Sequence, residues 1–314
     1  MTQRPASVLV NQPLSERTSF RIGGRARWFT EPESQEQLEE ALAWAAAAGL
    51  PLFVLGGGTN TLIPDEGFSG LVVSMGSYVG IERLDAVDDD LRHVSTLPGT
   101  PLRRVIHETM KWGLAGLERF VGIPGTIGGA VYGNAGGRGA EIGDFVKSVT
   151  VYDAGQLSTL SGSEIEWRYR SSGLGSRIIL EVTLGLPQGE RRQVTEVAKE
   201  LFNKKRASQP LRAASAGCVF RNPPGEHAGA LIERAGLKGE SVGGARVSDQ
   251  HANFIVNDGG ATADDVAQLI ARIQERVRQM FGVELQHEIV VPSAAVSSNS
   301  ESQTKWVGGK DATQ

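Results

Sequence analysis

The sequence lacks several features that would each point to a class of protein. It has one cysteine, Cys218, so no disulfide can form within the chain and a reducing cytoplasm is the expected location. No run of about 18 apolar residues occurs, so we expect no transmembrane helix. Residues 1–20 lack the apolar core of a signal peptide, and we expect none.

The chain also lacks an excess of basic charge. Its 314 residues include 32 Lys and Arg against 36 Asp and Glu, which gives a net charge of −4. Non-specific nucleic-acid binding needs a basic face, so we expect no nucleic-acid partner, and we also predict no metal site. A hydrophobic content of 40% is ordinary for a globular protein of two or three domains, and the oligomeric state stays open.

Glycine, by contrast, is abundant between residues 113 and 144. Nine glycines lie from Gly122 to Gly143, a density that disfavours helix and strand interiors. Apolar residues such as Phe120, Ile127 and Val131 are interleaved with them, which is unlike a flexible linker. We interpret the stretch as buried backbone that a ligand with phosphates or a flat ring approaches closely. A tightly turned loop packed on a core is the alternative.

A second glycine cluster, Gly56–Gly57–Gly58–Thr59–Asn60, follows the short apolar run Leu52–Leu55. Consecutive glycines after a strand can direct several backbone N–H groups into one concavity that binds an anion. Neither the G-x-G-x-x-G fingerprint nor a Gly-Lys-Ser/Thr loop occurs here. The two clusters together therefore favour a phosphate-containing ligand that is bound by neither of those two standard motifs.

Three motifs, in this order along the chain, resemble those of the UDP-N-acetylenolpyruvoylglucosamine reductase family. They are LGGGTN, the DEGFSGLVV run at Asp65–Val73, and GLAGLERFVGIPGTIGGAVYGNAGGRGAEI. The resemblance covers most of the chain before its polar tail. It implies an α+β fold, with a vanillyl-alcohol-oxidase-type (PCMH-type) two-part FAD-binding region plus a C-terminal α+β substrate-binding domain.

The resemblance also implies FAD as cofactor and NADPH as co-substrate. No histidine falls within the two glycine loops, so we expect FAD to be bound non-covalently. The residues expected to bind it are Gly56, Gly57, Gly58, Thr59, Asn60, Ile123, Pro124, Gly125, Thr126, Gly128, Gly129 and Ala130.

The implied activity is NADPH-dependent reduction of UDP-N-acetylenolpyruvoylglucosamine to UDP-N-acetylmuramate through bound FAD, in peptidoglycan precursor synthesis. Three positions match the family's catalytic residues: Arg170 in WRYRSS, Cys218 in SAGCVFRNP and Glu288 in LQHEIVV. Cys218 departs from the family pattern, which has a serine as general acid. A thiol has a pKa of about 8.5 and can donate a proton near neutral pH.

Without the resemblance, these three residues have ordinary interpretations. Arg168 and Arg170 would be a surface pair on one face of a strand, Cys218 a small buried hydrophobe, and Glu288 a solvated carboxylate. The resemblance further implies substrate contacts at Arg206, Asn222 and either Gln250 or His251, between which the sequence does not choose.

Two other functions remain open at this point. One is another FAD-dependent oxidoreductase of the same fold, acting on an alcohol or a lactone. The other is a non-catalytic module that binds a nucleotide-sugar or a flavin. Between Arg206 and Glu288 there is no insertion long enough for the family's substrate-capping tyrosine loop, so the chain resembles the shorter type.

We expect four parts: FAD-binding subdomain 1 at 1–75, FAD-binding subdomain 2 at 76–190, a substrate-binding domain at 191–292 and a disordered tail at 293–314. Ser34 and Gln37 form a capping-box pattern for a helix that ends at Gly49, and Thr262 begins a long helix that ends at Gly282. A hairpin is expected at 79–97. A helix at 190–205 is expected to lead into the third part, and strands are expected at 165–169 and 284–291.

Overall fold

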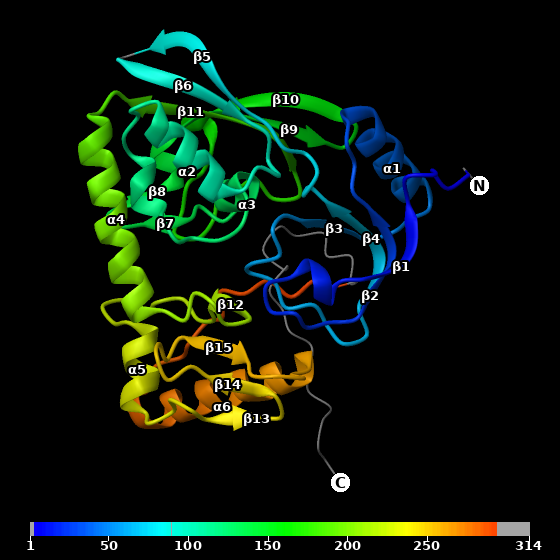
Figure 1. The fold of residues 1–314 in the computed structure, drawn as a ribbon. Coiled ribbons are helices and arrows are strands. Elements are labelled where there is room, and N and C mark those ends of the chain that lie inside the picture. The colour runs from blue at the N-terminus through cyan, green and yellow to red at the C-terminus, as the bar shows by residue number, and fades with distance from the viewer. Residues whose placement is uncertain (1–2, 89, 294–314) are drawn as a thin grey trace. The chain divides into compact units, whose positions relative to one another are not determined.

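The structure, a computed structural model, describes residues 3–88 and 90–293 (Figure 1). The chain divides into two compact units. The first consists of Met1–Leu9, Phe29–Gly57 and Val72–Ser208, and the second of Val10–Trp28, Gly58–Leu71 and Gln209–Gln314. The four-part division from sequence stays a prediction, and its tail lies outside the described residues from position 294 onward.

A four-stranded sheet with the order β1–β2–β4–β3 contains residues of both units. Its strands are β1 (Leu9–Pro13), β2 (Arg25–Thr30), β3 (Leu52–Leu55) and β4 (Phe68–Ser74). Helix α1 (Gln35–Ala47) follows β2, and the Ser34 hydroxyl accepts a hydrogen bond from the Gln37 N–H at 3.3 Å, which confirms the predicted cap. The glycine cluster at Gly56 begins where β3 ends.

The first unit also contains a five-stranded sheet with the order β10–β9–β11–β6–β5. All neighbouring strands in it are antiparallel. The strands are β5 (Ile81–Asp88), β6 (Leu91–Thr96), β9 (Val146–Asp153), β10 (Gln156–Ser161) and β11 (Ile178–Pro187). Strands β5 and β6 confirm the predicted hairpin.

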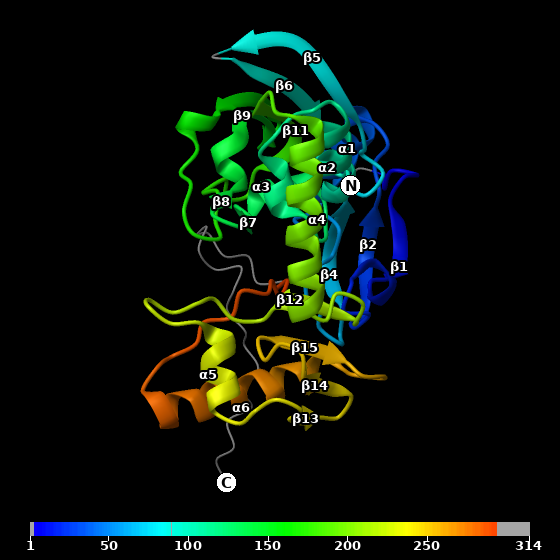
Figure 2. The same ribbon diagram turned by 60° about the vertical axis from the view of Figure 1, so that its left-hand side comes forward.

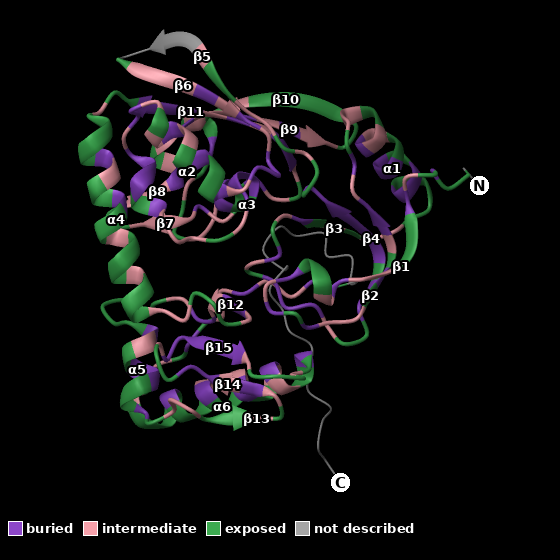
Figure 3. Ribbon diagram, viewed as in Figure 1, coloured by how far each residue is buried: buried purple, intermediate pink, exposed green. Residues whose placement is uncertain are grey.

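Helices pack against this sheet to form the core of the first unit. Val105 of α2 (Leu102–Lys111), Ile127 of α3 (Ile127–Tyr132) and Val182 of β11 are fully buried in one apolar cluster. Helix α4 (Arg191–Ser208) buries only Val194 and Ala198, and it packs on α2 and the 3₁₀ turn η2 (Leu117–Phe120) (Figure 2). The mostly exposed surface of α4 contrasts with the largely buried central strand β11 (Figure 3). Helix α4 therefore belongs to the first unit.

Short elements complete the first unit and part of the second. They are η1 (Ser15–Arg17), β7 (Gly136–Gly137), β8 (Ala140–Glu141), η3 (Ile142–Phe145) and η4 (Gly162–Glu164).

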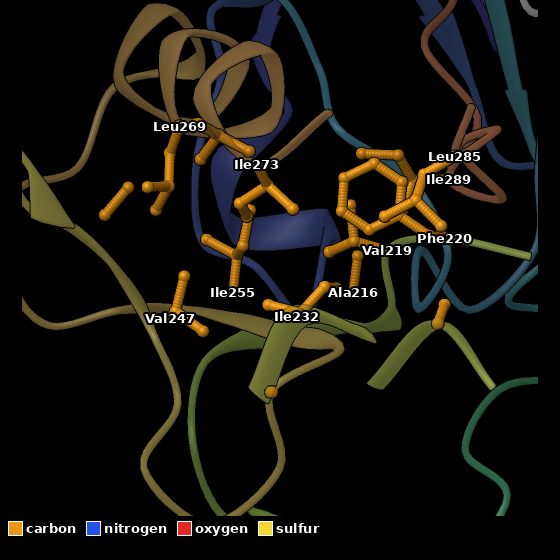
Figure 4. Close-up of a cluster of buried hydrophobic side chains, with 14 of the residues drawn as sticks. Ala216, Val219, Phe220, Ile232, Val247, Ile255, Leu269, Ile273, Leu285 and Ile289 are labelled. Carbon is orange, nitrogen blue, oxygen red and sulfur yellow. The ribbon is translucent and has the colours of Figure 1, made fainter. Parts of the chain in front are cut away.

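The second unit has an antiparallel sheet with the order β12–β15–β14–β13 and two helices. The elements are β12 (Ser215–Cys218), α5 (Ala228–Arg234), β13 (Ser241–Val242), β14 (Ala245–Val247), β15 (Phe254–Asn257) and α6 (Ala263–Phe281). Figure 4 shows Ile255 of β15 close to Leu269 and Ile273 of α6, with Phe220, Leu285 and Ile289 gathered at another part of the same core.

Two predicted strands are wrong. At 165–169, Arg168 and Ser171 instead close a tight turn through two mutual backbone hydrogen bonds of 2.8 and 3.0 Å. At 284–291 no regular strand is assigned, and the segment pairs with separate neighbours through single bridges, Thr61 with Val290 and Phe220 with His287. In both cases tertiary hydrogen bonds override a local strand pattern.

The long C-terminal helix is capped at both ends as predicted. Thr262 Oγ1 accepts from the Asp265 N–H at 3.0 Å, and the Asp265 carboxylate accepts from the Thr262 N–H at 3.0 Å. Gly282 ends α6 with a left-handed φ of +68°. Asp65 adds to the same helix start by accepting from the Ala263 N–H at 2.9 Å. Among the helices in the described part of the chain, none is long and apolar enough to cross a membrane.

The capping box of Thr262 and Asp265 predicts that the stability of the folded protein depends on pH. Hydrogen bonding from the Thr262 N–H chiefly holds the pKa of the Asp265 carboxyl below its ordinary value. The ionised Asp265 carboxylate therefore stabilises the folded protein fully above the unfolded-state pKa of about 3.9. This stabilisation is lost as pH falls through the lower folded-state pKa. Asp265→Ala should lower the free energy of unfolding at neutral pH by about 1 kcal/mol. Urea unfolding at neutral and acidic pH measures this difference.

The control is Asp264→Ala, which removes a charge from the same helical turn but leaves the capping box intact. It should cost a few tenths of a kcal/mol. Equal losses from the two variants, or an Asp265→Ala loss that persists undiminished in acid, would contradict this account of the cap.

Candidate active site

Two glycine-containing loops of the first unit meet backbone to backbone. A Cβ placed on Gly57 would lie 2.9 Å from Gly125 Cα, and one on Gly56 would lie 2.9 Å from Thr126 Oγ1. Thr126 is buried and caps α3, because its hydroxyl accepts from the Gly129 N–H at 3.3 Å. A side chain added at Gly56 or Gly57 would therefore displace the loop of Gly125 and Thr126. The two loops predicted to hold the cofactor therefore lie directly against each other.

Other glycines of the predicted cofactor loops have a reason in the fold alone. Gly58 has a φ of +60°, and a Cβ there would lie 2.1 Å from the carbonyl oxygen of Arg17. A Cβ on Gly128 would lie 2.7 Å from Cβ of Pro98. These two glycines are therefore required by packing, and they carry no independent evidence for a ligand.

The remaining cofactor candidates differ in exposure. Pro124, Gly129 and Asn60 are exposed, Ile123 and Thr59 are half-buried, and Ala130 is buried. Asn60 has a structural role in the second unit, because its side-chain amide donates to the carbonyl oxygen of Glu288 at 3.2 Å.

Arg170 occupies the third position of the turn Arg168–Ser171, not a strand. Its φ of +59° lies in the left-handed region, which is unfavourable for residues that have a β-carbon. Glycine or asparagine usually occupies this position of such a turn. Arg168 and Arg170 therefore do not share the face of a strand, and that prediction is wrong. The half-buried Arg170 guanidinium lies 4.8 Å from the centre of the Tyr169 ring.

Cys218 ends strand β12 directly after a β-bulge. The register pairs Ser215 with Val256 but Cys218 with Phe254, so β12 carries one extra residue. Gly217 has a φ of +78°, and a Cβ there would meet nothing within 4 Å, so the glycine is needed for its backbone angle and not for space. Bulges of this kind redirect the next side chain. The sequence Ala-Gly-Cys thus sets the direction of the half-buried thiol.

Glu288 lies on a segment that is hydrogen-bonded to the residue next to Cys218. The Glu288 N–H donates to the Val219 carbonyl at 2.6 Å, and the Val290 N–H donates to the Asn60 carbonyl at 2.9 Å. The second unit therefore brings Cys218 and Glu288 onto adjacent segments. Arg170 belongs to the first unit.

Asn253 is a residue that the sequence reasoning missed. Its side chain is 4% exposed, and its amide makes two hydrogen bonds to Phe220: Oδ1 accepts from the Phe220 N–H at 2.9 Å, and Nδ2 donates to the Phe220 carbonyl at 2.8 Å. Its own carbonyl accepts from the Val219 N–H at 2.8 Å. The side chain of Asn253 therefore replaces a strand partner for Phe220, and its backbone carbonyl pairs with Val219. In the sequence, the signal for this role is a polar residue directly before the apolar run Phe254–Val256.

The predicted substrate contacts lie in both units. Arg206 is exposed in the last turn of α4 in the first unit. In the second unit, exposed Asn222 accepts from the Ala228 N–H at 3.0 Å and so holds the start of α5. Gln250 is exposed, whereas His251 is partly buried and packs edge-on against Phe254 at 5.0 Å.

His251 has a defined protonation preference. Burial, and then the positive charge of Lys238, lower the pKa of the His251 imidazole. Its Nδ1 accepts from the Asn253 N–H at 3.3 Å, so a neutral ring would carry its proton on Nε2. Substrate contact by either Gln250 or His251 stays a prediction.

Comparisons with known proteins agree with this geometry. Residues 26–161 match the family model described as FAD binding domain, and residues 209–292 match that described as UDP-N-acetylenolpyruvoylglucosamine reductase, C-terminal domain. The chain is 40% identical over 291 residues to UDP-N-acetylenolpyruvoylglucosamine reductase 2 of Symbiobacterium thermophilum, covering 91% of this chain and 92% of that one. It is 42% identical over 286 residues to the reductase of Moorella thermoacetica, covering 90% and 93%.

A solved structure from the same family is also similar to this chain. The UDP-N-acetylenolpyruvylglucosamine reductase from Thermus caldophilus superposes with a TM-score of 0.75 at 34% sequence identity. The match covers 90% of this chain and 97% of that one.

The contact between Gly57 and Gly125 predicts a sensitive position for cofactor binding. Gly57→Val should force the two loops apart and weaken FAD affinity by about 10- to 100-fold, because overpacking costs about 1–3 kcal/mol. The protein should then purify without yellow colour. FAD titration by fluorescence quenching measures the affinity directly.

Ala47→Val, at an exposed position at the end of α1, provides the control and should retain FAD. Far-UV circular dichroism shows whether both variants are folded. A folded Gly57→Val protein that binds FAD as tightly as wild type would contradict a role for this contact in binding the cofactor.

Proposed function

The chain belongs to the UDP-N-acetylenolpyruvoylglucosamine reductase family, and from this premise we propose that it acts on its substrate through Arg170, Cys218 and Glu288. It is an FAD-dependent oxidoreductase that uses NADPH to reduce UDP-N-acetylenolpyruvoylglucosamine to UDP-N-acetylmuramate in peptidoglycan precursor synthesis. The observation that carries the residue assignment is the hydrogen-bonded pairing of the Cys218 and Glu288 segments.

FAD would be held where the loops of Gly56–Gly57 and Gly125–Thr126 adjoin, since both glycine clusters predicted to bind it meet there. When bound, FAD supplies the hydride transfer that connects NADPH with the substrate's double bond. Binding is proposed to be non-covalent, because neither glycine loop contains a histidine.

Arg170 is proposed to stabilise charge on the substrate. Hydride addition to the terminal carbon of the enolpyruvyl double bond places negative charge on the adjacent carbon and on its carboxylate. A guanidinium is permanently charged, so a fixed one beside that carboxylate lowers the barrier without a proton transfer. The strained backbone of Arg170 supports this role, because left-handed non-glycine residues cluster at functional sites.

Cys218 is proposed to complete the reduction by protonating the adjacent carbon. Its Sγ–H bond breaks, the proton forms the new C–H bond, and the thiolate left behind is reprotonated from solvent. The bulge at Gly217 and the amide of Asn253 fix the strand that carries the thiol, so the donor is held in place before the substrate binds.

Glu288 is proposed to assist next to this donor. A carboxylic acid that is kept neutral can donate a hydrogen bond to a developing anion. Its backbone is fixed from both sides, by Val219 at its N–H and by Asn60 at its carbonyl. Asn60 therefore has a positioning role here in addition to its predicted place in the cofactor loop.

The remaining assignments concern substrate and location. Arg206, Asn222 and either Gln250 or His251 are proposed to contact the nucleotide-sugar. We propose a cytoplasmic location, where reducing conditions keep the one cysteine as a thiol.

The two half-reactions test the role of Cys218 separately. Cys218→Ala should react with NADPH nearly as wild type does, seen as loss of visible flavin absorbance under anaerobic conditions. Its half-reaction with the enolpyruvyl substrate should slow by about 10²- to 10⁴-fold, because the general acid is gone. Stopped-flow absorbance measures both rates.

Cys218→Ser is the matched control and should retain activity. Wild type should lose rate at alkaline pH as a thiol ionises, and the serine variant should lack that decline, because an alcohol does not ionise in that range. A folded but inactive serine variant, or equal losses in both half-reactions of Cys218→Ala, would contradict the assignment.

A further inference from the structure

The guanidinium of Arg170 occupies the space where Gly136 would carry a side chain. A Cβ placed on Gly136 would lie 2.4 Å from Arg170 Nη1, 3.3 Å from Cζ and 3.3 Å from Nη2. Real β-carbons do not approach nitrogen so closely, so an alanine there requires Arg170 to move. Tyr169 lies against the same guanidinium at 4.8 Å from its ring centre. The cation is thus held between an aromatic ring and a bare backbone.

Asn134 fixes the turn that carries Arg170. It is fully buried, its Nδ2 donates to the Arg168 carbonyl at 3.0 Å, and its Oδ1 accepts from the Gly143 N–H at 3.2 Å. It also has a positive φ of +40°, which asparagine tolerates better than most residues.

Ser172 fixes the other end of the same turn. Its hydroxyl donates to the Tyr132 carbonyl at 2.8 Å, and its N–H donates to the same oxygen at 3.2 Å. Residues 132, 134 and 136 therefore all support the Arg170 turn. A left-handed arginine is strained and persists only where its surroundings over-determine it, and these contacts do so.

We infer that Gly136 is a positioning residue for Arg170, and that Asn134 supports it by locking the Arg168–Ser171 turn. This rests on the proposed role of Arg170 in charge stabilisation. Residues 132–136 follow directly after the predicted cofactor loop at 123–130, within one glycine-rich stretch. A single continuous backbone therefore connects the loop expected to hold FAD with the support of the catalytic cation.

The test is a double-mutant cycle on the FAD-loaded enzyme. The variants are Gly136→Ala, Arg170→Ala and the double variant. The control is Gly133→Ala, where an added Cβ would meet only the Gly129 carbonyl at 3.4 Å and φ is −87°. The measured quantities are the rates of the two half-reactions, the melting temperature and the bound FAD. A crystal structure of Gly136→Ala shows where the guanidinium lies.

Gly136→Ala should slow the half-reaction with the enolpyruvyl substrate by about 10- to 100-fold, because misplacing a catalytic group by about 1 Å has such an effect. The NADPH half-reaction, bound FAD and melting temperature should stay near those of wild type and of Gly133→Ala. In the Arg170→Ala background the same change should have less than about a threefold effect, because the two residues act through one cation. The crystal structure should show a displaced guanidinium.

Three results would overturn the inference, and they are distinguishable. If Arg170→Ala is strongly impaired but Gly136→Ala slows the reaction equally in both backgrounds, Gly136 does not act through Arg170, while the proposed function stands. If Arg170→Ala reduces the enolpyruvyl substrate as fast as wild type, the proposed role of Arg170 fails and the inference fails with it. An unmoved guanidinium in Gly136→Ala also contradicts the inference.

Discussion

The first unit depends on backbone contacts that only glycine permits. Gly57 meets Gly125 with no room for a β-carbon, and Gly136 leaves the space that the Arg170 guanidinium fills. Each glycine in a structured region costs about 0.5–1 kcal/mol relative to alanine through lost chain entropy. The buried cluster of α2, α3 and the five-stranded sheet supports the stretch, so these glycines can remain ordered without side chains of their own.

The second unit holds a thiol and a carboxyl group on neighbouring segments that are distant in sequence. Asn253 replaces a strand partner for Phe220, and Glu288 is tied to the neighbouring Val219. Phe220 and Ile289 are buried in the same core, so apolar packing reinforces the hydrogen bonds (Figure 4). A buried amide with both its groups bonded is costly to replace, because truncation leaves two backbone groups unsatisfied. The thiol thus sits on rigid backbone.

Sequence reasoning succeeded where a local pattern has one physical meaning. Ser34, Thr262 and Gly282 mark helix ends, because their caps satisfy backbone groups within a few residues. The family is confirmed by the comparisons, and the motifs that carried the resemblance span both units. The chemical roles of Arg170, Cys218 and Glu288 stay predictions.

Sequence reasoning failed where distant contacts determine the backbone. The run from Ile165 to Tyr169 alternates like a strand, but Asn134 binds the Arg168 carbonyl and the chain turns instead. The supporting role of Gly136 has no local signature, and a polar residue before the run Phe254–Val256 is too common a pattern to reveal the role of Asn253. A glycine that accommodates a distant guanidinium resembles any loop glycine, and an asparagine that bridges Phe220 resembles the start of a strand.

In the proposed function, one chain carries out both half-reactions on one flavin. The most direct test is a visible absorption spectrum of the purified protein without oxygen, first after NADPH and then after UDP-N-acetylenolpyruvoylglucosamine. We expect a flavin band that bleaches with NADPH and returns with the nucleotide-sugar. A band that returns only when oxygen is admitted, or no band even after FAD is added, would contradict the proposed function.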